Sequence, residues 1–382
     1  MPEYTSQNTL RIAKRFHNRK RTYLLVNPLQ AKHIPVQPSR ALAMMDALGA
    51  RLARKYPDAG LVIGFAETAT AIGAVVAGHM GPHCVYLHTT RESFPGALHW
   101  IEFQEEHSHA VEQKLSDDAL SEQLSKTHCV ILVDDEISTG ATLLNMVAQL
   151  RQRHPCLAEK QIVAASILNR VSPEHEARMR QAGVQSEYLV KLPQEDYAAL
   201  VAPIEIREAD PALPRPLSFQ RRTLSCPPPG DPRLGVPFSD YRQSCLVMAR
   251  AFLEQALPHI PAGSRILTLG TEECMYPALV LGAMLEEMGR DYQVRCHATT
   301  RSPIGVCPDP GYPIRSGCRL PSFYDGERTT YLYDLEPCDV LIVISDTPAE
   351  GTDALCSLVG AFPPDGVRKV FYLQGGQHVW YL

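Results

Sequence analysis

The chain has 382 residues, of which 45% are hydrophobic and 21% charged, with a formal net charge of -5. A chain of this length is usually too long to pack around a single hydrophobic core, so two domains are expected. No apolar run is long enough for a membrane helix, and the start "MPEYTSQNTL" is too polar for a signal peptide, so we expect a cytoplasmic protein without a membrane partner. The acidic balance makes nucleic acid an unlikely partner, and the basic stretch 11–21 is expected to be a solvated helix face or tail.

Cysteine usage points the same way. The eleven cysteines are odd in number and include no Cys-x-x-Cys pair, which argues against a disulfide framework or a zinc ribbon. Reduced thiols in a cytoplasm fit this pattern.

The first domain, residues 1–205, is predicted to be α/β. Residues 61–80 and 129–150 each have an apolar strand, a small-residue loop and a helix, the order of a βα unit. Further strands are expected at 84–90 and 161–168. Such alternation predicts a Rossmann-like parallel sheet between helices.

Residues 206–238 are rich in proline and are predicted to be a linker or an extended strap. Residues 239–382 are expected to form a second, diverged α/β domain, because three of their segments echo the first domain in the same order. "ILTLGTEECMYPALVLGAMLEEMG" echoes 61–81, "HATTRSP" echoes 87–93, and "VLIVISDTPAEGTDAL" echoes 129–144. This pattern predicts a degenerate tandem repeat.

The stretch "CVILVDDEISTGAT" (129–142) carries the strongest chemical signal. Asp134 and Asp135 are expected at the carboxyl end of a strand, where ligands of open α/β sheets bind. The loop that follows has hydroxyls, a glycine and a helix start, which together form a phosphate cradle: Ser138, Thr139, Gly140, Ala141 and Thr142. Two carboxylates beside a cradle suit a diol with a nearby phosphate, such as ribose 5-phosphate. The alternative is a capped helix with two exposed acids.

This stretch resembles the phosphoribosyl pyrophosphate (PRPP) motif of type I phosphoribosyltransferases. The whole chain is similar to the two-domain, orotate-phosphoribosyltransferase-like members found in tellurite-resistance and stress-response gene neighbourhoods. Their second domain is named TRSP for a tetrapeptide that stands here at 300–303. "VNPLQAKHIPV", "GFAETATAIG" and "EEHSHA" match that family too.

The resemblance implies a role for each motif. Asp134 and Asp135 would hold the ribose hydroxyls, directly or through metal-bound water, and 138–142 would hold the 5-phosphate. The loop Glu67, Thr68, Ala69 and Thr70 resembles the pyrophosphate loop, where Glu67 needs an intervening Mg²⁺. Arg91 resembles the basic residue that grips pyrophosphate, although a surface ion pair is its alternative.

Residues 92–118 occupy the place of the flexible catalytic loop of this fold. We expect a hairpin lid or a disordered loop that closes over the diphosphate. His107 and His109 are candidates for pyrophosphate contact or acid/base catalysis, and alternatively for a metal site or plain surface positions.

The second domain lacks the full motif, since Ser345 and Asp346 replace the two acids and Ala349 and Glu350 replace the cradle hydroxyls. It is therefore not expected to bind PRPP in the same way. It is either a structural partner or the site of a different ligand, with these candidates: Glu272, Glu273, Arg301, Ser302 and Asp346.

The sequence thus predicts a Mg²⁺-dependent phosphoribosyltransferase that acts on PRPP and an unidentified small-molecule acceptor. A PRPP-sensing regulatory or assembly module is the alternative. A tandem arrangement like PRPP synthetase would need an ATP site, for which the sequence has no signal. A homodimer is compatible with these readings.

Overall fold

The computed structural model describes residues 3–18, 21–92, 98–104 and 111–381. These residues pack into two units. The first unit contains Ala43–Gln194 and Gly230–Gln243, besides the first few residues of the chain. The second unit contains Gln7–Leu42, Glu195–Pro229 and Ser244–Leu382. Segments that the sequence places in the first domain and the linker therefore pack with the second unit.

A six-stranded sheet forms the centre of the first unit, with the order β12-β4-β3-β7-β8-β9. All neighbours are parallel except the short edge strand β12, which pairs antiparallel with β4. The central strands are continuous buried apolar runs, as expected of a sheet covered on both faces. Their bounds are β3 Leu61–Gly64, β4 Val85–His88, β7 Cys129–Ile137, β8 Gln161–Asn169, β9 Val184–Lys191 and β12 Val236–Pro237.

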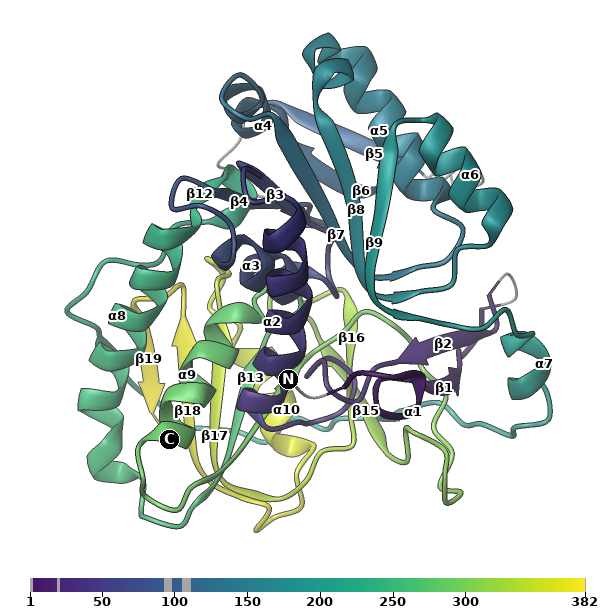
Figure 1. The fold of residues 1–382 in the computed structure, drawn as a ribbon. Coiled ribbons are helices and arrows are strands. Elements are labelled where there is room, and N and C mark those ends of the chain that lie inside the picture. The colour runs from purple at the N-terminus through teal and green to yellow at the C-terminus, as the bar shows by residue number, and fades with distance from the viewer. Residues whose placement is uncertain (1–2, 19–20, 93–97, 105–110, 382) are drawn as a thin grey trace. The chain divides into compact units, whose positions relative to one another are not determined.

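Helices cover both faces of this sheet (Figure 1), with α5 and α6 on one face and α2 and α3 on the other. Helix α3 packs closely on β3 where Gly73 faces Gly64. A Cβ atom on Gly73 would lie only 2.9 Å from the Gly64 Cα atom, so a larger residue would not fit there. An apolar core lies on the face covered by α5 and includes Ile63, Leu132 and Val147. The helices are α2 Pro38–Lys55, α3 Thr70–Gly78, α4 Asp117–Leu124, α5 Ala141–Arg153 and α6 Pro173–Gln181, with short 3₁₀ turns at η1 Pro155–Glu159 and η2 Pro232–Leu234.

A β-hairpin follows β4, formed by β5 (Trp100–Gln104) and β6 (Val111–Ser116). It is anchored at its base, where Thr90 and Lys114 exchange two backbone hydrogen bonds of 2.8 Å. Asp117 ties the following helix to α5, because Arg153 and His154 donate hydrogen bonds to it. Although burial raises the pKa of Asp117, these two partners hold it below its ordinary value.

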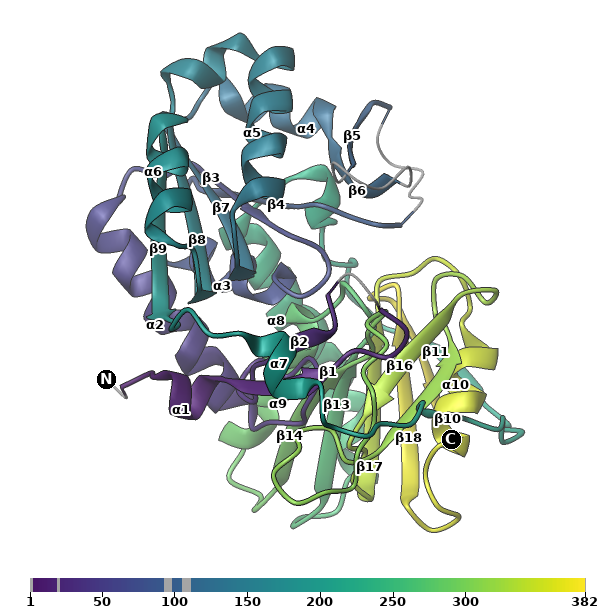
Figure 2. The same ribbon diagram turned by 90° about the vertical axis from the view of Figure 1, so that its right-hand side faces the viewer.

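The second unit is built around another six-stranded sheet, with the order β11-β19-β18-β17-β13-β14. Figure 2 shows β13, β17 and β18 of this sheet. Strands β18, β17, β13 and β14 are parallel, and β19 and β11 complete one edge in antiparallel fashion. The bounds are β11 Gln220–Thr223, β13 Arg265–Gly270, β14 Gln293–Ala298, β17 Cys338–Ser345, β18 Val367–Gln374 and β19 His378–Tyr381.

Two apolar cores lie on opposite faces of this sheet. One packs α8 (Phe238–Ala256) and α9 (Tyr276–Glu287) against residues such as Ile342 and Phe371. The other packs α10 (Thr352–Gly360) and strand β15 against residues such as Val343. The remaining elements are α1 Ser6–Thr9, β1 Arg11–Lys14, β2 Tyr23–Val26, α7 Tyr197–Val201, β10 Asp210–Pro211, η3 Leu257–His259, β15 Gly317–Pro321 and β16 Thr329–Tyr333.

The expected α/β architecture with parallel sheets is confirmed in both units. The basic stretch 11–21 differs from expectation, because its first residues form β1, which pairs antiparallel with β2. The proline-rich segment supplies the short strands β10, β11 and β12. Within the described ranges no helix has the length and apolarity needed to cross a membrane. All eleven cysteines are described, and each is a free thiol.

Candidate functional site

The two acids of the 129–142 stretch lie on β7, beyond the end of the neighbouring strand. Strand β3 ends at Gly64, which pairs with Val133, so Asp134 and Asp135 extend past it. The strand does not stop at the acids, as the sequence suggested, because β8 continues the pairing as far as Ile137. Successive side chains of a strand point to opposite faces. Asp134 and Asp135 are nevertheless close enough for their side chains to interact at the carboxyl end of the sheet.

Asp135 is joined to the loop after β3 by a direct hydrogen bond. The Thr68 hydroxyl donates to an Asp135 carboxylate oxygen at 2.8 Å. The loop is fixed at its start by the Ala66 amide, which donates to the Thr89 hydroxyl at 2.8 Å. Glu67 and Thr70 in this loop are buried, and the Ala66–Glu67 peptide bond is cis. The structure thus brings the predicted pyrophosphate loop and one predicted ribose acid together.

Asp134 has a different environment. It pairs in register with Ser166 of β8, and its carboxylate accepts a 2.9 Å hydrogen bond from the Asp135 amide. Burial raises the pKa of Asp134 well above its ordinary value, and the nearby negative charges of Asp135 and Glu136 raise it further. A cation or a hydroxyl-bearing ligand at this edge would relieve that repulsion and favour the carboxylate form.

Residues 138–142 make the turn from β7 into α5. Gly140 precedes the helix in the left-handed conformation, with φ of 74°, which an L side chain adopts only with strain. The Ala141 amide donates to the Thr139 hydroxyl at 3.2 Å, and Thr139, Ala141 and Thr142 are exposed. The first amides of a helix have no partner within it, and the helix dipole adds positive potential there. Ser138 is half-buried at the base of the turn.

Arg91 follows the bridge between Thr90 and Lys114 and is exposed. It leads into 92–118, whose described parts form the β5–β6 hairpin and the start of α4 rather than an irregular loop. His107 and His109 lie outside the described residues. Their predicted roles remain predictions.

One charged residue near the acids, Arg170, belonged to no predicted motif. Arg170, just after β8, lies 3.5 Å from Glu136, measured between Nε and a carboxylate oxygen. The Thr68 hydroxyl contact was also missed, because the resemblance gave that loop only backbone roles. The signal for Arg170 was its place at the carboxyl end of a predicted strand. Among the described residues no group of three or more His, Cys, Asp or Glu side chains could hold a metal ion by itself.

The second unit repeats the backbone framework of this site. Gly270 pairs with Ile344 as Gly64 pairs with Val133, which makes Asp346 the register counterpart of Asp135. Gly351 precedes α10 with φ of 64°, as Gly140 precedes α5. Three sets of hydrogen bonds match. Phe65 N donates to Val133 O as Thr271 N donates to Ile344 O, and Ala66 N donates to Thr89 Oγ1 as Glu272 N donates to Thr299 Oγ1. The backbones of Thr90 and Lys114 exchange two hydrogen bonds, as those of Thr300 and Tyr331 do.

The candidate side chains of the second unit are brought together only in part. Glu272 and Arg301 form an ion pair, with 2.8 Å between Nε and a carboxylate oxygen. Asp346 accepts a hydrogen bond from the Tyr324 hydroxyl. Ser302 contributes its carbonyl oxygen to the Tyr333 hydroxyl, and Glu273 is buried.

Comparisons with known proteins agree with this geometry. Residues 9–194 match the family model described as phosphoribosyl transferase, and residues 233–362 match the model described as the TRSP domain C-terminal to it. The two matches follow one another in the order of a phosphoribosyltransferase domain and a TRSP domain, and the matched parts are named accordingly. No curated protein matches the chain. The two-domain order implied by the resemblance is confirmed, as is the type I phosphoribosyltransferase-like fold of the first domain.

Solved structures that match part of the chain include APRTase from Giardia lamblia in complex with 9-deazaadenine, at 17% identity and a TM-score of 0.35 over 50% of this chain and 97% of that one. Adenine phosphoribosyltransferase from Rhodothermus marinus is 14% identical, with a TM-score of 0.33 over 49% of this chain and 96% of that one. Orotate phosphoribosyltransferase from Aeropyrum pernix is 13% identical, with a TM-score of 0.29 over 47% of this chain and 87% of that one.

Proposed function

We propose that the phosphoribosyltransferase domain transfers ribose 5-phosphate from PRPP to a small-molecule acceptor and releases pyrophosphate. The hydrogen bond between Thr68 and Asp135 carries this proposal, because it fixes the predicted pyrophosphate loop against a predicted ribose acid. The turn at Gly140 begins the next helix only five residues further along the chain. The three parts of PRPP thus have three adjoining partners at one sheet edge.

Each part of the substrate has a physical reason to bind where we place it. The amides at the start of α5 attract the 5-phosphate, because the first N–H groups of a helix have no partner within the helix and lie at the positive end of its dipole. Asp134 and Asp135 accept hydrogen bonds from the ribose hydroxyls, which a neutral side chain accepts less strongly. Arg91 supplies positive charge for the diphosphate at the end of the β4 segment.

The reaction then needs one bond exchange. A nucleophilic atom of the acceptor forms a bond to C1 of the ribose, the bond from C1 to the diphosphate oxygen breaks, and pyrophosphate leaves with the electron pair. Binding of all three parts of PRPP holds C1 in place for that attack. Pyrophosphate is stabilised as it leaves by the loop amides and by Arg91.

Magnesium is the cofactor in this proposal. Carboxylate and hydroxyl oxygens are the donors that Mg²⁺ prefers, and it usually binds one or two carboxylates together with substrate oxygens and water. Asp134 and Asp135 fit this donor set, because burial and then the neighbouring negative charge raise the pKa of Asp134, and a cation beside it would favour the carboxylate form. When bound, the ion would neutralise charge on the diphosphate. The resemblance adds a cytoplasmic role in tellurite resistance and stress response to the proposal.

The test is release of pyrophosphate from PRPP with Mg²⁺ and a panel of nitrogen-containing acceptors. We expect release that depends on one class of acceptor, together with a product heavier than that acceptor by one ribosyl phosphate. PRPP binding without release for any acceptor class would contradict transfer and favour the PRPP-sensing alternative. A Thr68→Val variant should release pyrophosphate more slowly, because Asp135 loses its hydroxyl partner.

A further inference from the structure

The TRSP domain has a glutamate, Glu272, at the position where the first unit has an alanine, Ala66. Glu272 is the counterpart of Ala66, since each amide donates to the hydroxyl of a threonine that follows the next strand, at 2.9 and 2.8 Å. Arg301 is likewise the counterpart of Arg91, one residue after the matching bridge. The two loops therefore make the same backbone hydrogen bond and differ in side chain, which is a carboxylate at Glu272 and a methyl group at Ala66.

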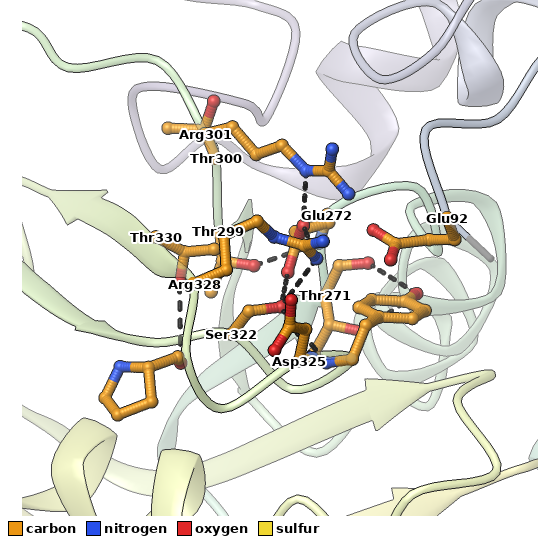
Figure 3. Close-up of polar contacts among 12 residues, drawn as sticks. Glu92, Thr271, Glu272, Thr299, Thr300, Arg301, Ser322, Asp325, Arg328 and Thr330 are labelled. Atoms are coloured by element: carbon orange, nitrogen blue, oxygen red, sulfur yellow. Dashed lines mark hydrogen bonds and ion pairs between the residues drawn. The ribbon is translucent and has the colours of Figure 1, made fainter. Parts of the chain in front are cut away.

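The Glu272 side chain is fully buried among three donors (Figure 3). One carboxylate oxygen accepts from the Ser322 hydroxyl at 2.5 Å. The other accepts from Arg301 Nε and from Arg328 Nη2, both at 2.8 Å. Arg328 and Ser322 come from the turn between β15 and β16, so segments distant in sequence converge on this one anion.

The backbone holds Glu272 in place at a conformational cost. Its φ is 45°, in the left-handed region that side-chain-bearing residues rarely adopt without strain. The Lys32 ammonium, itself buried, donates to the carbonyl oxygens of Glu272 and Thr299 at 2.8 Å each. The Glu272 backbone is thus held by Lys32 and its side chain by Ser322, Arg301 and Arg328, so the carboxylate is fixed in one direction.

Two guanidinium groups and a hydroxyl that converge on a pair of oxygens are a donor set for phosphate as well as for carboxylate. We propose that the TRSP domain contains a phosphate-class anion site that is closed by its own Glu272 carboxylate. The carboxylate takes the place of a ligand oxyanion and engages Arg301. The wild-type chain therefore binds one diphosphate, in the first unit. This count for the first unit rests on the proposed function.

Glu272→Gly tests the inference, because glycine removes the carboxylate and tolerates the left-handed backbone. Inorganic pyrophosphate is the probe, with calorimetry for stoichiometry and thermal unfolding for stability. We expect one bound pyrophosphate per wild-type chain and two per Glu272→Gly chain. Adding Arg301→Ala should remove the second. A folded Glu272→Gly chain with unchanged stoichiometry would overturn the inference.

Glu272→Gln is the matched control, because it keeps the volume of the side chain and one of its two acceptor oxygens, so the site stays filled and no second pyrophosphate should bind. The two proposals fail separately, since a first unit that binds no pyrophosphate would give zero for wild type and one for Glu272→Gly. If Glu272→Gly folds only in millimolar pyrophosphate, that result supports the inference, because a ligand that occupies the site stabilises the folded chain. A chain that stays unfolded in pyrophosphate would contradict the inference.

Discussion

Replacing Asp134 and Asp135 together by asparagine should reduce PRPP affinity by about 10²-fold or more, since each lost charged hydrogen bond costs roughly 1.5–3 kcal/mol. Turnover should fall at least as far. The fold should survive, because both acids lie on the part of β7 that extends past β3. Calorimetric titration with PRPP and Mg²⁺ measures the loss. Asp346→Asn is the matched control, as the register counterpart of Asp135 in the TRSP domain, and should leave PRPP affinity unchanged.

The same double variant should be more stable than wild type at neutral pH. Burial and neighbouring carboxylates raise the pKa of Asp134 above its ordinary value. A raised pKa stabilises the fold below the ordinary aspartate range near pH 4, and this stabilisation is lost as the pH rises through the raised value. Asparagine carries no charge, so the variant avoids that loss. Thermal unfolding between pH 4 and 8 should show wild type falling relative to the variant, and parallel curves would contradict the assigned environment of Asp134.

Gly140→Ala should weaken PRPP binding by roughly tenfold or more, because a shift of the loop misaligns several donors to the phosphate, each worth about 1 kcal/mol. Alanine is strained at φ of 74°, and its Cβ would lie 2.9 Å from the Met179 sulfur. Gly351→Ala is the matched control, with φ of 64° and a Cβ 2.8 Å from the Tyr372 hydroxyl. We expect both variants to lose stability and only Gly140→Ala to lose affinity. Equal losses of affinity would mean that the turn at Gly140 is not the phosphate cradle.

The sequence predicted the local elements well, because strand, loop and helix signals lie within a few residues of one another. Apolar runs followed by small residues located β3, β7, β13 and β17, and the glycines at 140 and 351 both precede helices in the left-handed conformation. The extent of β7 was not predictable in this way. Residues 134–136 are acidic, and they remain in the strand because β8 pairs with this part of β7.

Long-range partners were beyond the sequence. Arg328 and Ser322 contact Glu272 across some fifty residues, and no spacing rule joins them. The segment at 26–36 gave no sign of its place, yet Val36 pairs with Cys296 and Lys32 caps two carbonyls of the second unit. Such contacts depend on how elements meet in three dimensions. The roles of His107 and His109 remain predictions.

A structure of the chain with PRPP and Mg²⁺ tests the central claim most directly. We predict one PRPP per chain, with its 5-phosphate on the amides of residues 139–142 and its ribose hydroxyls on Asp134 and Asp135. Its diphosphate should lie on the loop at 66–70, beside Thr68. PRPP bound at Glu272 and Arg301 of the TRSP domain, or a ligand that leaves both Asp134 and Asp135 untouched, would contradict this account.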